Sequence, residues 1–150
     1  VKAGWRVRSP SFPFPMKTPK PGTVSWFDLT VPDADTVRDF YSAVAGWSVM
    51  PIEMGGYNDY CMMPPRSKAP AGGICHARGE NADLPPQWLI YITVPKLAAS
   101  LKACVANGGK ILRPAKAMGG ARMAVIRDPA GAVAALYQPA TVKPRAKRKR

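Results

Sequence analysis

A carboxylate and a phenol occupy matching positions in two strand-like segments of this sequence. Asp28 lies in residues 26–32 (Trp-Phe-Asp-Leu-Thr-Val-Pro), and Tyr91 lies in residues 89–95 (Leu-Ile-Tyr-Ile-Thr-Val-Pro), 63 positions later. A carboxylate held beside a phenol can supply charge or act as a general base. We therefore consider Asp28 a candidate catalytic residue, with Tyr91 and Tyr137 as hydrogen-bonding partners. The alternative is a structural role, in which Asp28 bonds only backbone or tyrosine groups.

A helix-like pattern follows each of these segments and would fix its position. After the first, Asp33 is a good N-cap, the apolar residues recur at helical spacing, and Gly46 can end the helix. After the second, Leu97, Leu101, Cys104 and Val105 form a similar stripe, which stops at residues 107–109 (Asn-Gly-Gly). We expect a helix behind each strand.

The remaining apolar runs complete two similar halves, each of the form β-α-β-β-β. Residues 55–56 (Gly-Gly) favour a hairpin between two of the strands, and residues 128–131 (Asp-Pro-Ala-Gly) favour a turn between the last two. The order predicts one α+β domain built by internal duplication. The strands expected are 23–31, 47–54, 57–63 and 71–77 in the first half, and 87–94, 110–112, 122–127 and 132–138 in the second.

Charge and proline content separate the ends of the chain from this domain. The net charge is +13, yet five basic residues lie in 1–20 and six in 143–150, with no acidic residue in either segment. We expect 1–21 to be a basic, proline-rich disordered arm, 22–140 to be the domain (modules 22–80 and 87–140), and 141–150 to be a basic tail. The tail predicts at most weak, salt-dependent binding to nucleic acid.

Several classes of protein are disfavoured by composition. No apolar run approaches the roughly 18 residues of a membrane span, so we expect no membrane partner. Three widely spaced cysteines without a paired motif fit a reducing compartment, and we expect a cytoplasmic protein. The single histidine, His76, argues against serine-histidine-aspartate chemistry. No P-loop or dinucleotide-binding glycine motif is present.

Taken together, the motifs resemble the vicinal-oxygen-chelate superfamily of glyoxalases, bleomycin-resistance proteins and extradiol dioxygenases. The resemblance implies two βαβββ modules whose curved mixed sheets form a cleft, with the helices outside. The motifs that carry it are Trp26-Phe27-Asp28-Leu29 with Pro32-Asp33, Phe40-Tyr41, Gly46-Trp47, Trp88-Leu89-Ile90-Tyr91 with Val94, Asn107-Gly108-Gly109, Arg127-Asp128-Pro129-Ala130-Gly131 and Leu136-Tyr137-Gln138.

In metal-using members of this superfamily, four ligands come from the first and last strand of each module. By resemblance, three of these positions fall on Trp26, Leu89 and Ala135, and the fourth falls on Cys75 or His76, depending on the register. Indole, isobutyl and methyl groups offer no lone pair suited to a divalent metal. We therefore expect no metal and no cofactor.

The prediction for function is a small-molecule-binding member of the superfamily, as either a monomer or a homodimer. The alternative is an enzyme of the glyoxalase, isomerase or dioxygenase type that uses Asp28 or a divalent metal at unmapped positions. Trp88, Met62 and Met118 are either further lining or ordinary core. The residues predicted to line the cleft are Trp26, Asp28, Leu89, Tyr91, Met123, Ala135 and Tyr137.

Overall fold

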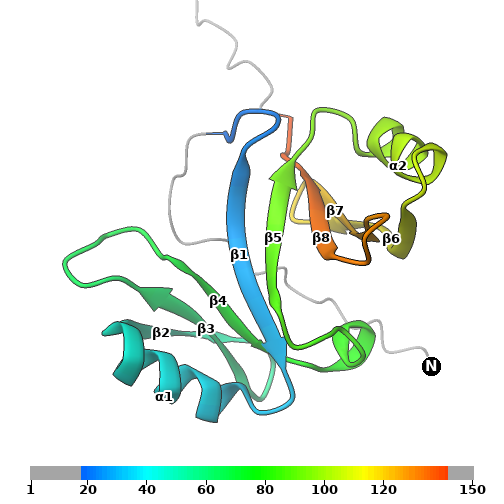
Figure 1. Ribbon diagram of the computed structural model, residues 1–150. Helices are drawn as coiled ribbons and strands as arrows, with labels where there is room; N and C mark the ends of the chain where they lie inside the picture. The colour runs from blue at the N-terminus through cyan, green and yellow to red at the C-terminus, as the bar shows by residue number, and fades with distance from the viewer. Residues whose placement is uncertain (1–17, 142–150) are drawn as a thin grey trace, which may run out of the picture.

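The computed structural model describes residues 18–141, which form one eight-stranded mixed sheet with two helices (Figure 1). The strand order is β2-β3-β4-β1-β5-β8-β7-β6. The predicted disordered arm and basic tail fall mostly on residues 1–17 and 142–150, outside the described residues. The elements are β1 (Val24–Val31), α1 (Ala34–Ala45), β2 (Ser48–Glu53), β3 (Asn58–Met63), β4 (Gly72–His76), the 3-10 turn η1 (Gly79–Asn81), β5 (Trp88–Thr93), α2 (Leu97–Ala106), β6 (Lys110–Met118), β7 (Ala121–Arg127) and β8 (Val133–Gln138).

The predicted duplication is confirmed by the strand pairing. Strands β1 and β4 are parallel neighbours in the first module, and β5 and β8 are parallel neighbours in the second. The modules join edge to edge through antiparallel pairing of β1 with β5, the blue and green strands at the centre of Figure 1. The two copies of the repeated segment therefore lie side by side in the middle of the sheet.

Strand alternation assigns one face of the sheet to the helices. Leu29 and Val31 of β1 pack with Ile74 of β4 in the core beneath α1. Ala124 and Leu136 pack with Leu97 beneath α2. The intervening residues point to the opposite face, which we call the inner face; it carries Trp26, Asp28, Leu89, Tyr91, Met123 and Ala135.

The two helices begin with different caps. In α1, the side chain of Asp33 accepts hydrogen bonds from the backbone N–H of Thr36 at 3.0 Å and from its hydroxyl at 2.7 Å. Lys96, the residue before α2, provides no side-chain cap. Instead, the backbone N–H of Leu97 donates to Oε1 of Gln138, which comes from the last strand, at 2.7 Å. The second helix is therefore fastened to the sheet by a long-range contact.

One strand is longer than the sequence pattern predicts. The expected strand 110–112 continues through Pro114 to Met118 as β6. Proline lacks an N–H and is tolerated at a sheet edge, and β6 is the edge strand of the second module, with irregular pairing between Ile111 and Lys116. This extension brings Arg113 and Lys116 onto a wall of the site described below.

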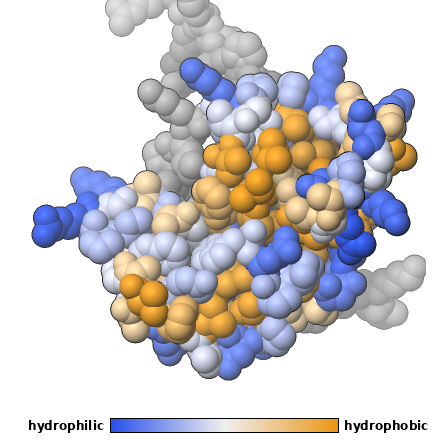
Figure 2. Space-filling model, viewed as in Figure 1, coloured by the Kyte–Doolittle hydropathy of each residue, from blue (hydrophilic) through white to orange (hydrophobic). Residues whose placement is uncertain are grey.

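Hydrophobic side chains gather over the middle of the sheet in the view of Figure 2. On β1, Val24 and Phe27 have exposed fractions of 44% and 43%, and on α1 Phe40 and Val44 are also exposed. Of the apolar residues at helical spacing in α1, only Val37 and Tyr41 pack against the core.

In residues 18–141, neither helix is long and apolar enough to cross a membrane.

Candidate functional site

A row of side chains crosses the inner face from one module to the edge of the other. Trp26 pairs with Tyr91, Tyr91 with Ala135, Ala135 with Val125, and Val125 with Arg113. Adjacent strands lie about 4.8 Å apart, so Tyr91 and Val125 are roughly 10 Å apart along this row. Between them stands only the methyl group of Ala135, which is fully buried. The row therefore leads from the hydroxyl of Tyr91, past the apolar side chains of Ala135 and Val125, to the guanidinium of Arg113.

The polar centre is a hydrogen bond between two residues at equivalent positions of the repeat. The Tyr91 hydroxyl donates to Oδ2 of Asp28 at 2.7 Å. Oδ1 of Asp28 is buried, and no group of residues 18–141 donates a hydrogen bond of standard geometry to it. A Cβ added at Gly73 of β4 would lie 3.3 Å from Cβ of Asp28, so the glycine allows close approach.

Burial controls the protonation of this pair. The pKa of Asp28 is raised from 3.8 to about 6, mainly by burial; the hydroxyl of Tyr91 and the indole of Trp26 oppose this rise, and the charge of Asp59 contributes to it. Burial, followed by the charge of Asp28, raises the pKa of Tyr91 well above its usual value. Tyr91 is therefore a neutral hydrogen-bond donor near neutral pH, and Asp28 is a carboxyl group that titrates close to physiological pH.

The register of β4 decides between Cys75 and His76. Cys75 pairs with Thr30 and so lies on the inner face, whereas His76 pairs with Val31, whose side chain belongs to the core beneath α1. The backbone N–H of His76 donates to Oδ1 of Asp59 at 2.8 Å. Burial raises the pKa of the Cys75 thiol well above its usual value, and the charges of Asp28 and Asp59 add to this effect. Cys75 is therefore a poor nucleophile.

The superfamily's metal does not fit the residues at its four positions. Trp26, Leu89 and Ala135 present no atom that coordinates a divalent metal. On β4, only the protonated thiol of Cys75 faces inward. Within residues 18–141, no group of three or more histidine, cysteine, aspartate or glutamate side chains is arranged to hold a metal ion. The polar group beside these positions is the Asp28–Tyr91 pair, since Asp28 pairs with Leu89 and Tyr91 with Trp26.

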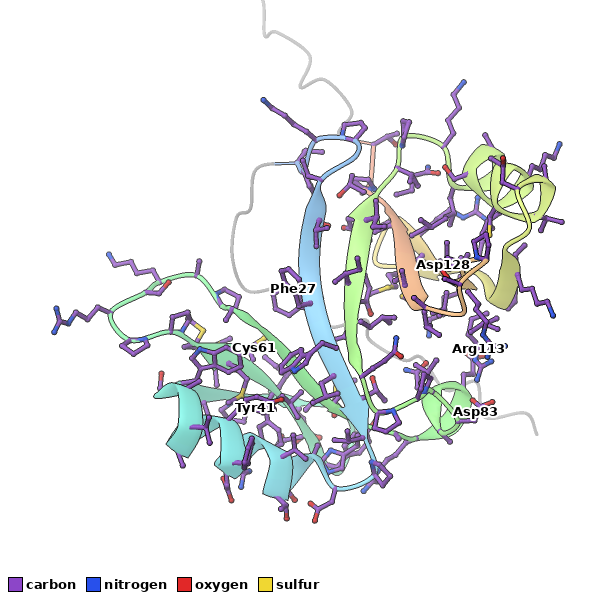
Figure 3. The ribbon with its side chains drawn as sticks, viewed as in Figure 1. Phe27, Tyr41, Cys61, Asp83, Arg113 and Asp128 are labelled. Atoms are coloured by element: carbon purple, nitrogen blue, oxygen red, sulfur yellow. The ribbon has the colours of Figure 1, made fainter. Side chains whose placement is uncertain are left out.

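A pocket in the second module borders the inner face at Met123 and Val125. This pocket of about 690 Å³ is bounded by η1 with the residues after it, by the irregular part of β6 and by β7. Arg113 and Asp83 point toward each other at its rim (Figure 3). Ligand pockets typically occupy about 300–1,000 Å³. The lining residues are Gly79, Glu80, Asn81, Ala82, Asp83, Arg113, Pro114, Ala115, Lys116, Met123, Ala124 and Val125.

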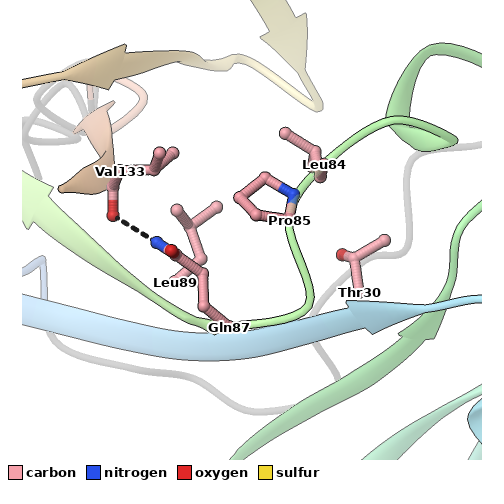
Figure 4. A pocket seen from close by; sticks show the side chains of 6 residues that line it. All are labelled: Thr30, Leu84, Pro85, Gln87, Leu89 and Val133. Atoms are coloured by element: carbon pink, nitrogen blue, oxygen red, sulfur yellow. Dashed lines mark hydrogen bonds between the residues drawn. The ribbon is translucent and has the colours of Figure 1, made fainter. Parts of the chain in front are cut away.

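A smaller cavity lies between the linker that joins the modules (residues 78–86) and the central strands. Thr30 and Leu89 form its floor, and Leu84 and Pro85 of the linker lie opposite (Figure 4). Nε2 of Gln87 donates to the carbonyl oxygen of Val133 at 3.1 Å and closes one side. Its volume is about 10 Å³, which is roughly room for a single water molecule. This cavity is too small for an organic ligand.

The structure gathers most of the predicted lining residues into one cluster. Of the predicted residues, only Met123 borders the larger pocket. Leu89, Tyr91 and Ala135 are buried in the cluster, and Trp26 and Tyr137 pack against it. Tyr137 pairs with Thr93 and Met123. Met62 and Trp88, which the sequence left as lining or core, belong to the core beneath α1, where the indole N–H of Trp88 donates to the Tyr41 hydroxyl at 3.0 Å.

Sequence reasoning missed Arg113, Lys116, Glu80 and Asp83 as site residues. These charges lie in a linker and in an edge strand that are about 30 positions apart in the sequence. No local pattern marks such residues, because the pairing depends on where the linker crosses the sheet.

Comparison with known proteins identifies the family. The family model of the Glyoxalase/Bleomycin resistance protein/Dioxygenase superfamily matches residues 23–136. The chain belongs to this superfamily. This is the vicinal-oxygen-chelate superfamily that the repeated segments resemble.

Sequence relatives include proteins about twice as long. The glyoxylase candidate CFP32 of Mycobacterium tuberculosis is 34% identical over 120 residues, which cover 78% of this chain and 46% of that protein. The anthracycline biosynthesis protein DnrV of Streptomyces peucetius is 29% identical over 130 residues, which cover 79% of this chain and 47% of that protein. The chain therefore spans about half the length of these relatives.

Solved structures share the fold at low sequence identity. Methylmalonyl-CoA epimerase from Streptomyces coelicolor, in a complex with 2-nitronate-propionyl-CoA, has a TM-score of 0.53 and 17% identity, covering 84% of this chain and 100% of that chain. Methylmalonyl-CoA epimerase from Mycobacterium tuberculosis has a TM-score of 0.50 and 18% identity, covering 79% and 88%. This likeness concerns the fold alone.

Proposed function

We propose that this protein binds a small organic ligand on the inner face of its sheet, without a catalytic metal. The observation that carries the proposal is the pocket of about 690 Å³ beside Met123 and Val125. Its floor continues into the apolar cluster around Tyr91 and Ala135. Three of the superfamily's four metal positions carry Trp26, Leu89 and Ala135, which cannot coordinate a metal. This supports binding that depends on shape and apolar contact.

The names of the relatives do not agree on one ligand. CFP32 is named as a glyoxylase candidate and DnrV as an anthracycline biosynthesis protein, and each is about twice as long as this chain. We therefore do not transfer a substrate from either, and we expect the ligand to be defined by the pocket of this chain.

Two measurements on the purified protein test this proposal. Metal analysis is expected to find no stoichiometric divalent metal, and a thermal-shift screen of small organic molecules is expected to give stabilising compounds. Anything that binds only the folded state raises its stability in proportion to the logarithm of the ligand concentration. A stoichiometric metal, or compounds that stabilise only the metal-loaded protein, would contradict a metal-independent function.

A second candidate function is an enzyme of the glyoxalase or isomerase type that uses Asp28 as an acid–base group. It is favoured by the buried Asp28 carboxyl with its pKa of about 6, held by the hydroxyl of Tyr91. A general base is most effective when its pKa lies near the working pH. The test is Asp28→Asn: this function predicts loss of turnover, and unchanged turnover together with unchanged ligand affinity would contradict a functional role for Asp28.

The predictions for compartment, oligomeric state and nucleic-acid binding are also proposals. We place the protein in a reducing compartment such as the cytoplasm because the described cysteines, Cys61, Cys75 and Cys104, are free. The homodimer is tested by analytical ultracentrifugation. Weak nucleic-acid binding through the basic tail is tested by deleting residues 141–150 and measuring the salt dependence of binding to random DNA.

A further inference from the structure

The charged rim of the larger pocket has an uneven arrangement. Arg113 pairs with Asp83, and Nζ of Lys116 lies 3.5 Å from Oε2 of Glu80. The side chains of the two acids are 75% and 79% exposed, whereas those of Arg113 and Lys116 are 29% and 44% exposed. The cations therefore form part of the wall, and the carboxylates lie over them from the solvent side.

Backbone contacts hold the guanidinium of Arg113 in place without Asp83. Its Nε donates to the carbonyl oxygen of Glu80 at 2.9 Å, and Nη1 donates to the carbonyl oxygen of Leu112 at 2.8 Å. Only Nη2 is directed at the carboxylate of Asp83. A guanidinium fixed in this way can exchange one carboxylate for another without losing its orientation.

The acids are exposed side chains of a short segment. Glu80 lies within the 3-10 turn η1 and Asp83 follows it, in the linker between the modules. Exposed ion pairs contribute little to stability because water and salt compete with them. Replacing these two carboxylates by a carboxylate from a ligand is therefore inexpensive, provided that the ligand also gains apolar contact.

We propose that Arg113 and Lys116 form a carboxylate-binding subsite, and that Asp83 and Glu80 occupy it until an organic carboxylate replaces them. The ligand class is an amphipathic carboxylate: its acid group pairs with Arg113, and its apolar body packs on Met123, Val125 and Pro114. This inference rests on the proposed function, and it names the chemical class of the ligand for that pocket.

The test uses two probes of the same shape, 2-naphthoate and its neutral counterpart 2-naphthamide, titrated into the full chain by isothermal calorimetry at low salt. We expect the naphthoate to bind about tenfold more tightly than the amide, as one charge-assisted hydrogen bond allows. Arg113→Gln removes this preference. Arg122→Gln, an exposed cation of β7 that does not line the pocket, leaves it unchanged.

Asp83→Asn is the decisive variant, because it removes the internal competitor and retains the cation. We expect it to bind naphthoate about three- to fivefold more tightly than the parent chain, with no change for the amide. Asp83 is exposed, so this variant remains interpretable even if Arg113→Gln fails to fold. A purely structural ion pair predicts no gain in affinity.

Three outcomes overturn the inference. If Asp83→Asn binds naphthoate no better than the parent, the acids do not compete for the subsite. If both probes bind equally, the pocket takes apolar ligands without reading a charge, and the proposed function stands. If neither probe binds, the carboxylate class is wrong, and the proposed function then depends on the thermal-shift screen.

Discussion

The two modules share one topology and differ in what their inner faces offer. In the first module, Asp28, Asp59 and Cys75 make the inner face polar and closely packed. In the second, the equivalent surface is apolar around Met123 and Val125 and opens into a pocket. Duplication therefore explains the fold, whereas divergence between the copies explains the different character of the two inner faces.

The seam between the modules, where β1 pairs with β5, shows this divergence most directly. Asp28 and Tyr91 are the same position of the repeat, yet one is an acid and the other a phenol, and they bond each other. Two aspartates there would repel, whereas the Tyr91 hydroxyl can donate to the Asp28 carboxylate. This hydrogen bond exists only because the two copies differ at this position.

The largest effect is expected from the cores beneath the two helices. Ile74→Ala in the first module and Leu97→Ala in the second each remove a fully buried side chain and should lower the free energy of unfolding by about 2–5 kcal/mol. Because the sheet is continuous through β1 and β5, each variant should shift one common transition.

Urea unfolding followed by tryptophan fluorescence and by far-ultraviolet circular dichroism checks this. Trp47 and Trp88 report on the core beneath α1, Trp26 reports on the inner-face cluster, and circular dichroism reports on both modules. If Leu97→Ala shifted only the circular-dichroism transition, the modules would unfold separately.

The next effect is the dependence of stability on pH through Asp28, which lies at the seam. The folded-state pKa of Asp28 is raised to about 6 from 3.8, so the folded protein binds this proton more tightly than the unfolded chain. The resulting stability is present below about pH 4 and is lost as the pH rises through about 6. Asp28→Asn removes this loss, so its stability relative to the parent should increase by about 2 kcal/mol between pH 4 and pH 7.

Asp39→Asn is the matched control for that measurement. Asp39 is exposed, and its hydrogen bond from Arg38 lowers its pKa, so the difference from the parent should have the opposite sign. A pH-independent difference for Asp28→Asn would show that Asp28 is ionised in the folded protein at every pH tested.

The smallest effect compares the two helix caps. Asp33→Ala removes a local cap of α1, and Gln138→Ala removes the long-range cap of α2. Each should lower stability by about 1 kcal/mol. In hydrogen exchange, Asp33→Ala should loosen only the first turn of α1, whereas Gln138→Ala should also loosen the end of β8. Equal, purely local effects would remove this distinction between the modules.

The sequence was informative where periodicity and repetition determine structure. The repeated segments, the cap at Asp33 and the glycine hairpin predicted the two βαβββ modules, because these signals are local. The register of β4 was left open between Cys75 and His76, because a shift of one residue exchanges the faces and only pairing with β1 fixes it.

The pocket was beyond the reach of sequence patterns. The predicted strand 110–112 stopped short of Pro114, although an edge position accepts proline and β6 continues to Met118. The predicted lining residues Leu89 and Ala135 instead lie buried in the cluster.

The most direct test of metal-independent ligand binding is an NMR titration of metal-free, isotopically labelled protein with the strongest binder from the thermal-shift screen. Dialysis against a chelator removes divalent ions beforehand. We predict binding that is unaffected by the chelator, with amide shifts concentrated at Arg113, Met123 and Val125 and in residues 79–83. Binding that requires an added divalent metal, or shifts that centre on the exposed surfaces of α1 or α2, would contradict a metal-independent site in this pocket.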